Sequence, residues 1–208
     1  IAVLSFIVWA HHMFTAGMLL STMIFFMYTT MLVSVPTGIK VFNWVATMYK
    51  GALTFETPML FAIGFISMFT LGGLTGLMLA IAPADFQYQD TYFVVGHFHY
   101  ALVAGTLLSM FAGIYYWVPK WTGHYYSERL GKLHFWLSLI SVNITFMPMH
   151  FLGLAGMPRR IPDYALQFAD FNAWCTLGAF IFGFAQLIFV YNMIQTMRKK
   201  KKKASGQV

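Results

Sequence analysis

The stretch YFVVGHFHYALVAGTLLSMFAGIYYWVP, residues 92–119, contains no Asp, Glu, Lys or Arg. It exceeds the roughly 20 apolar residues that a helix needs to cross a bilayer. Residues 1–10 are also apolar but too short to span, and we expect them to be the end of an earlier helix. Four other stretches qualify as spans, at about 18–49, 57–81, 130–152 and 170–197. The sequence therefore predicts an all-α fold, a polytopic transmembrane helix bundle with about five complete spans plus the end of a sixth.

The composition excludes a water-soluble domain. Of the 208 residues, 59% are hydrophobic and 9% are charged, whereas soluble domains carry about 25% charged residues. Disordered and disulfide-rich secreted proteins are excluded by the same numbers. The only cysteine, Cys175, permits no internal disulfide.

The net charge of +7 is concentrated at the end of the chain, where Arg198 and the lysine run 199–203 supply six of the thirteen basic residues. We expect residues 1–197 to form the transmembrane region and residues 198–208 a basic cytoplasmic tail near anionic lipid, without a nucleic-acid partner. Five spans then place two other loops in the cytoplasm, and the basic residues there agree with the positive-inside rule. These residues are Lys50, Lys120, Arg129 and Lys132.

Two features concern the start of the chain and its first span. The N-terminal residues include neither an initiator Met nor the basic flank of a signal peptide, so we expect the C-terminal part of a longer or split polypeptide. Pro36 lies inside the first span, where its missing N–H should kink the helix or leave a carbonyl free.

His11 and His12 are adjacent in VWAHHMFTAGM. Neutral imidazoles bind copper, iron or zinc well, but two ligands do not close a site, so at least one more ligand must come from elsewhere. The alternative is a pair of interfacial histidines bonded to water or lipid headgroups.

His97 and His99 flank Phe98 near one end of the third span. Two positions on an α-helix are about 200° apart, so the imidazoles should point to opposite sides and could ligate two cofactors. Haem iron takes axial histidine, and Gly96 would remove bulk where a macrocycle presses. The alternative is two polar side chains that are satisfied across helix interfaces.

Lys40 lies within the first span, and Thr30, Ser34 and Thr37 form a loose polar stripe before it. An intramembrane lysine is costly unless it snorkels, pairs or serves a polar path. The sequence indicates a proton route, with snorkelling toward the cytoplasmic end as the alternative.

Arg159 and Arg160 depart from the positive-inside pattern. Guanidinium groups pair bidentately with carboxylates such as haem propionates. The alternative is a pair with Asp163 or with lipid phosphate.

Four motifs, HHMFTAGM, VPTGIKVFNWVATM, DTYFVVGHFHY and HFLGLAGMPRRIPDY, closely resemble subunit I of the haem–copper oxidases in order and spacing. The resemblance covers essentially the whole chain. The versions TAGM, HFHY and PRRIPDY look more like a cytochrome c oxidase of the aa3 type than a quinol oxidase of the same family.

This resemblance implies ligand roles for the histidines. His11 and His12 match two copper ligands of the binuclear centre. His97 matches the proximal ligand of the high-spin haem, haem a3, and His99 matches an axial ligand of the low-spin haem, haem a. Phe98 would lie between the two haems.

The resemblance also assigns the charged residues. Lys40, with Thr37 nearby, matches a proton channel that ends at the binuclear centre, and Arg159 and Arg160 match a propionate-binding pair. Asp85 would lie in a loop near the propionates. Asp90 matches an acidic ligand of a magnesium site, but Gln89 stands where the family usually has histidine, which puts magnesium in doubt.

The implied function is part of the catalytic subunit of a proton-pumping terminal oxidase, which reduces O2 to water with electrons from cytochrome c. The implied partners are the N-terminal half of subunit I, a copper-bearing subunit II and subunit III. Other family ligands belong to that N-terminal half, so we expect an oxidoreductase only in the assembled complex, in a bacterial plasma membrane rather than a mitochondrial one. The alternatives are a quinol oxidase of the same fold, or a membrane scaffold or transporter without cofactors.

Overall fold

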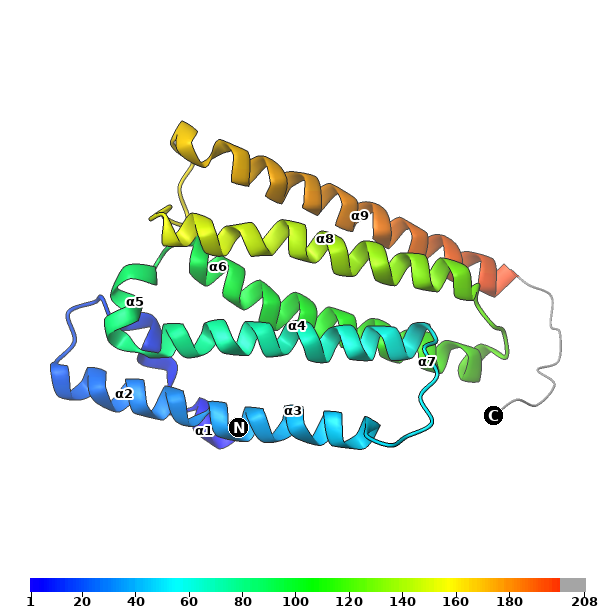
Figure 1. The fold of residues 1–208 in the computed structure, drawn as a ribbon, viewed down its shortest axis with the longest axis horizontal. Helices are drawn as coiled ribbons and strands as arrows, with labels where there is room; N and C mark the ends of the chain where they lie inside the picture. Colours follow the sequence, from blue (N-terminus) through cyan, green and yellow to red (C-terminus); the bar gives the residue numbers. More distant parts are fainter. Residues whose placement is uncertain (199–208) are drawn as a thin grey trace.

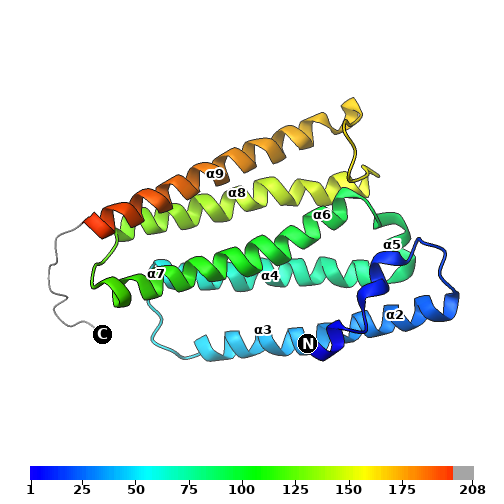
Figure 2. The ribbon, with the colours of Figure 1, turned by 180° about the vertical axis from the view of Figure 1, so that it is seen from behind.

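Helices joined by short loops make up residues 1–198, which are the residues that the computed structural model describes (Figures 1 and 2). The first half contains α1 (Ala2–Ser5), the 3-10 helix η1 (Trp9–Met13), α2 (Leu20–Leu32), α3 (Ser34–Met48), α4 (Thr57–Ala80) and α5 (Ala82–Tyr88). The second half contains α6 (Tyr92–His99), the π-helix η2 (Tyr100–Leu108), α7 (Ser109–Thr122), α8 (Glu128–Leu154), the 3-10 helix η3 (Leu166–Phe168) and α9 (Ala169–Arg198).

The predicted all-α transmembrane bundle is confirmed, since five helical segments are long and apolar enough to cross a membrane and the described residues form no strand. The segments are Leu20–Met48, Thr57–Ala80, Tyr92–Thr122, Glu128–Leu154 and Leu166–Arg198. The short α1 and η1 precede them, where the end of a sixth helix was expected. The lysine run of the predicted cytoplasmic tail lies outside the described residues.

The first span is interrupted next to Pro36, as the sequence predicts. Helix α2 ends at Leu32 and α3 begins at Ser34. Proline has no N–H to continue the ladder, and both the amide and the hydroxyl of Thr37 bond the carbonyl of Val33, at 3.3 and 2.8 Å. These two bonds continue the helix directly after the proline, whereas the carbonyl that loses its N–H partner to Pro36 is that of Leu32, four residues earlier.

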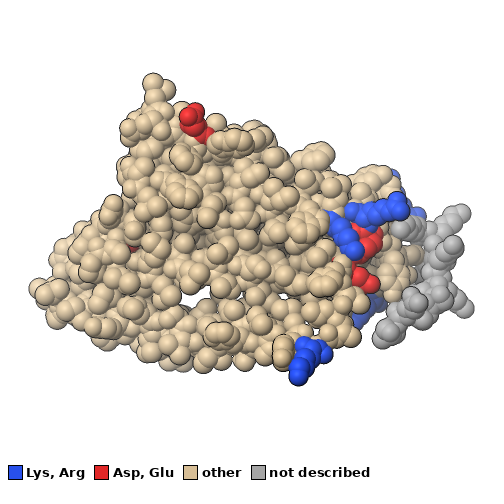
Figure 3. All heavy atoms as spheres, in the orientation of Figure 1, with Lys and Arg blue, Asp and Glu red and all other residues tan. Residues whose placement is uncertain are grey.

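The core lies between α4, η2, α7 and α8 and is largely aromatic. The ring of Phe61 on α4 stacks on Tyr115 of α7, with 5.6 Å between centroids, and contacts Phe135 of α8 edge-on at 5.1 Å. Tyr115 also contacts His134, which is completely buried. At the end of the bundle away from α5, basic side chains gather on the surface, as expected for the cytoplasmic face (Figure 3).

Helices α6 and α8 cross with their backbones in close approach. A Cβ on Gly153 of α8 would overlap the backbone nitrogen of Phe93 on α6, so only glycine allows this approach. The amide of Tyr92 donates to the carbonyl of Met157 at 3.0 Å, just past the crossing. This contact fixes the start of α6, the helix that carries His97 and His99.

We predict that Gly153→Ala lowers the stability of the purified protein by about 1–3 kcal/mol, the usual cost of overpacking. The measurement is thermal unfolding followed by circular dichroism. Gly183→Ala on α9 is the matched control, because a Cβ there meets nothing within 4 Å. Equal stability of the two variants would contradict the crossing described here.

Candidate functional site

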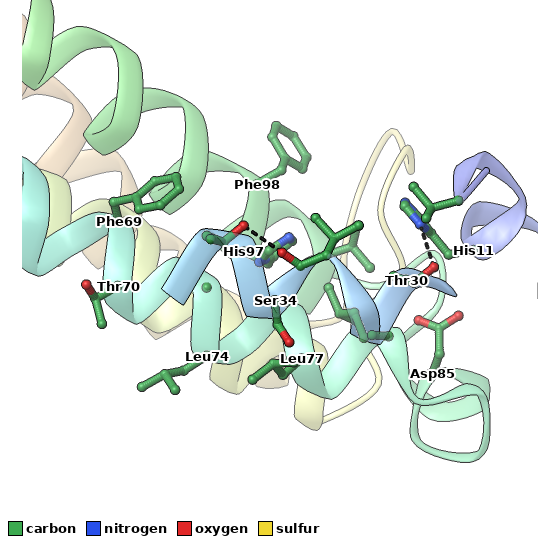
Figure 4. A pocket seen from close by; sticks show the side chains of 18 of the residues that line it. His11, Thr30, Ser34, Phe69, Thr70, Leu74, Leu77, Asp85, His97 and Phe98 are labelled. Atoms are coloured by element: carbon green, nitrogen blue, oxygen red, sulfur yellow. Dashed lines mark hydrogen bonds between the residues drawn. The ribbon is translucent and has the colours of Figure 1, made fainter. Parts of the chain in front are cut away.

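A cavity of about 640 Å³ lies among η1, α2, α3, α4, α5 and α6 (Figure 4). Its wall is mostly apolar, as is usual for sites that hold a bulky organic ligand. A few polar side chains open on it. They are His11, His12, Thr30, Ser34, Thr37, Thr70, Asp85, Gln89, His97 and Arg159.

His97 lies on the cavity wall and is held by α4. Its Nδ1 donates to the carbonyl of Gly72 at 2.9 Å, which leaves the lone pair of Nε2 available for a metal. The ring packs on Gly76, where an added Cβ would come within 2.8 Å of the ring carbon Cε1. The backbone of α4 therefore sets both the tautomer and the orientation of this imidazole.

His99 lies on the other side of α6, as the spacing predicts, and does not line the cavity. Its ring stacks on Phe146 of α8 and on Phe98, with 4.3 Å between centroids in each case. Its Nδ1 donates to the carbonyl of Val95 at 2.8 Å, so the Nε2 lone pair of this histidine is also free.

The role expected for Gly96 is wrong in this structure. The space that glycine leaves is filled by a protein side chain, because a Cβ there would come within 2.8 Å of the imidazole of His150. His150 is buried, and its Nε2 has no hydrogen-bond partner. Sequence reasoning missed His150 and His134, although an intramembrane histidine is itself a signal for a functional site.

His11 and His12 converge. Their Nε2 atoms are 3.0 Å apart, and Nδ1 of His11 is 3.3 Å from the hydroxyl of Thr30. Two nitrogens at this separation can both bind one metal ion, because metal–imidazole bonds are about 2.0–2.1 Å long. Within residues 1–198, no group of three His, Cys, Asp or Glu side chains could hold a metal ion.

Asp85 on α5 is almost completely buried, and its Oδ2 has no hydrogen-bond partner. Burial, and secondly the charge of Asp90, raise the pKa of Asp85 to about 7. A carboxyl group at the cavity wall therefore titrates near neutral pH.

Arg159 and Asp90 form an ion pair that joins the loop before α6 to the loop after α8. Nε and Nη2 of Arg159 lie 2.8 and 2.7 Å from Oδ1 of Asp90, and the backbone amide of Arg159 donates to the Asp90 carbonyl at 2.8 Å. Arg159 thus pairs with Asp90, the expected magnesium ligand, rather than with Asp163. Arg160 has a positive φ of 63° and does not line the cavity.

The polar stripe of the first span faces the cavity, which Thr30, Ser34 and Thr37 all line. Lys40 is exposed and lies outside this wall, with Nζ 5.1 Å from the centroid of the Trp44 ring. The three hydroxyls therefore line the cavity on the side of the first span that leads toward Lys40, but Lys40 itself does not line the cavity.

These donors fit a haem and a copper ion. The cavity has the size of ligand sites in general, about 300–1,000 Å³, and carries an oriented imidazole for iron. Two converging imidazoles suit copper, and the Arg159 guanidinium suits a carboxylate of the macrocycle.

Comparisons with known proteins show which family the chain belongs to. The family described as "Cytochrome C and Quinol oxidase polypeptide I" matches residues 1–181. "Quinol oxidase subunit 1" of Bacillus subtilis (strain 168) is 51% identical over 208 residues, covering 99% of this chain and 32% of the relative. "Cytochrome c oxidase subunit 1" of Cereibacter sphaeroides is 51% identical over 194 residues, covering 93% of this chain and 34% of the relative.

A solved structure shares the fold. The structure titled "Cryo-EM structure of a heme-copper terminal oxidase dimer provides insights into its catalytic mechanism" superposes with a TM-score of 0.83 and 21% identity, covering 98% of this chain and 41% of that one. The chain spans about a third of the length of the curated relatives. Five apolar spans and bacterial relatives indicate a multi-pass protein of a bacterial plasma membrane. The chain belongs to the haem–copper oxidase subunit I family.

Proposed function

We propose that the chain forms part of the catalytic subunit of a proton-pumping terminal oxidase that reduces O2 to water. The observation that carries the proposal is the arrangement of His11, His12 and His97 on one cavity. In it, one imidazole is oriented by a backbone carbonyl and two converge at 3.0 Å. When bound, haem a3 and copper would supply the redox chemistry at this cavity.

The histidines of α6 serve two cofactors in this proposal. His97 would offer Nε2 to the high-spin haem, while the Gly72 carbonyl holds its Nδ1 proton. His99 would offer Nε2 to the low-spin haem a on the opposite side of the helix. Phe98 lies between them in sequence and lines the cavity, so the two haems would be held by one rigid element.

The arginines near the cavity would hold the carboxylates of a bound haem. Arg159 lines the cavity and would bind a propionate, with Arg160 beside it. Asp85, whose pKa is about 7, holds a proton near neutral pH at the same wall. We keep magnesium as a further candidate at Asp90, although the Arg159 guanidinium already neutralises this carboxylate.

Protons would enter along the first span. Lys40 is exposed beyond the cavity, and the Thr37, Ser34 and Thr30 hydroxyls line the wall that leads inward. Hydroxyls in a row can hold a chain of waters between a charged group and a reaction centre. Lys40 and Thr37 are therefore our candidates for proton delivery.

The remaining cofactor ligands would come from the N-terminal half of subunit I, since copper needs at least one more histidine and the low-spin haem a second one. A copper-bearing subunit II and subunit III complete the proposed complex. His97 and His99 argue against a scaffold or transporter without cofactors, because polar side chains within spans are costly to keep without a function.

We propose cytochrome c as the electron donor, because TAGM, HFHY and PRRIPDY resemble the cytochrome c oxidases. Quinol is the second candidate, because a quinol oxidase subunit and a cytochrome c oxidase subunit are equally identical to this chain, at 51%.

We predict that the purified complex shows haem a bands in a reduced-minus-oxidised spectrum and consumes O2 with reduced cytochrome c. Oxygen consumption with quinol alone would favour the second candidate. A complex that contains no haem would contradict the oxidase proposal altogether.

We predict that His97→Ala and His99→Ala disturb different haems, because the two imidazoles lie on opposite sides of α6. The His97 variant should lose carbon monoxide binding, which needs the high-spin iron, while the low-spin absorption band remains. The His99 variant should first lose the low-spin band. If both variants lost the same haem, the two-sided assignment would be wrong.

We predict that Lys40→Met slows steady-state oxygen consumption by about 100-fold, the scale at which a positioned proton-transfer group contributes. Haem content should stay unchanged, because Lys40 does not line the cavity. Lys50→Met is the matched control, since Lys50 is an exposed lysine after the end of the same span. Near-normal turnover of the Lys40 variant would leave this residue as an interfacial anchor.

A further inference from the structure

Gln89 forms a long-range contact with the histidine pair. It lies at the end of α5 and lines the cavity, and its side-chain Nε2 donates to the backbone carbonyl of His12 at 2.9 Å. The two residues are 77 positions apart in sequence. A carbonyl accepts only from a donor, so the contact requires the amide nitrogen of Gln89, rather than its oxygen, to face His12.

Gln89 is itself held in place on both sides. Its backbone amide donates to the carbonyl of Asp85 at 2.7 Å. The next residue, Asp90, has a positive φ of 55° and is fixed by Arg159 through both its carboxylate and its carbonyl. The side-chain donor therefore projects from a backbone segment with little freedom.

We propose that Gln89 is a positioning residue for the His11–His12 pair, whose side-chain N–H fixes the His12 carbonyl and thereby the direction of both imidazoles at the cavity rim. This inference rests on the copper role proposed above for the pair. Gln89 acts through the backbone and touches neither the metal nor O2.

The donor role is distinct from the cation role that the family resemblance assigns to this position. An amide can offer its oxygen to a divalent cation, and in that case the oxygen of Gln89 would matter. In the contact described here the nitrogen matters. Replacing the amide by an isosteric carboxylate separates the two roles, because it removes the donor and strengthens the oxygen ligand.

The experiment compares Gln89→Glu and Gln89→Leu in the assembled complex. The readout is the infrared stretching band of carbon monoxide on the copper, recorded before and after incubation with a Cu(I) chelator. Both variants should shift this band and retain copper about tenfold less well, the lower end of the range for losing a hydrogen bond that orients a metal ligand. The low-spin haem band should not change.

The control is Gln87→Glu, because Gln87 is an exposed glutamine on the same short helix and does not line the cavity. It should behave like the parent complex. If Gln89→Glu keeps the parent band and copper retention, the contact is only packing and the proposal is overturned.

A second measurement uses complexes from cells grown with manganese. If Gln89→Glu gains a bound Mn²⁺ signal in electron paramagnetic resonance while its copper band stays unchanged, the oxygen is the functional atom and the donor role is wrong. A parent complex without any copper band would instead refute the proposed function, and this inference with it.

Discussion

Polar side chains inside a bilayer must find their partners within the protein, because lipid offers none and each unsatisfied group costs several kcal/mol. This constraint explains how the histidines of this chain are placed. Nδ1 of His97, His99 and His150 each bonds a backbone carbonyl of a helix. The hydrogen bond that satisfies Nδ1 also fixes the tautomer, so that Nε2 keeps its lone pair for a metal.

The sequence predicts the spans well because their hydropathy is a local property, and the five segments observed lie close to the expected ranges. It also predicts the opposite directions of His97 and His99, because helical geometry alone fixes that relation. The interruption of the first span near Pro36 could also be predicted from local sequence, since it follows from the missing N–H of a single residue.

Contacts between distant segments could not be predicted in this way. Nothing local to Gly96 indicates that His150 fills its open face, and nothing local to Arg159 selects Asp90 over the nearer Asp163. Each depends on how α6 and α8 cross, and therefore on the overlap that Gly153 avoids. From the sequence, Gln89 could be recognised only as a departure from the family pattern. Its contact with His12 depends on the packing of the end of α5 against η1, which the sequence does not reveal.

The π-helix η2 separates two tasks along one span. A π-turn closes at i→i+5 and so holds one residue more than an α-turn, while one residue rotates an α-helix by roughly 100°. The π-helix therefore changes the rotation, about the common helix axis, of the α7 side chains relative to the histidines of α6. The α7 side chains concerned are aromatic core residues such as Phe111 and Tyr115. A single-residue deletion within Tyr100–Leu108 would leave the histidines in register with α4 and turn the aromatic face away from its core.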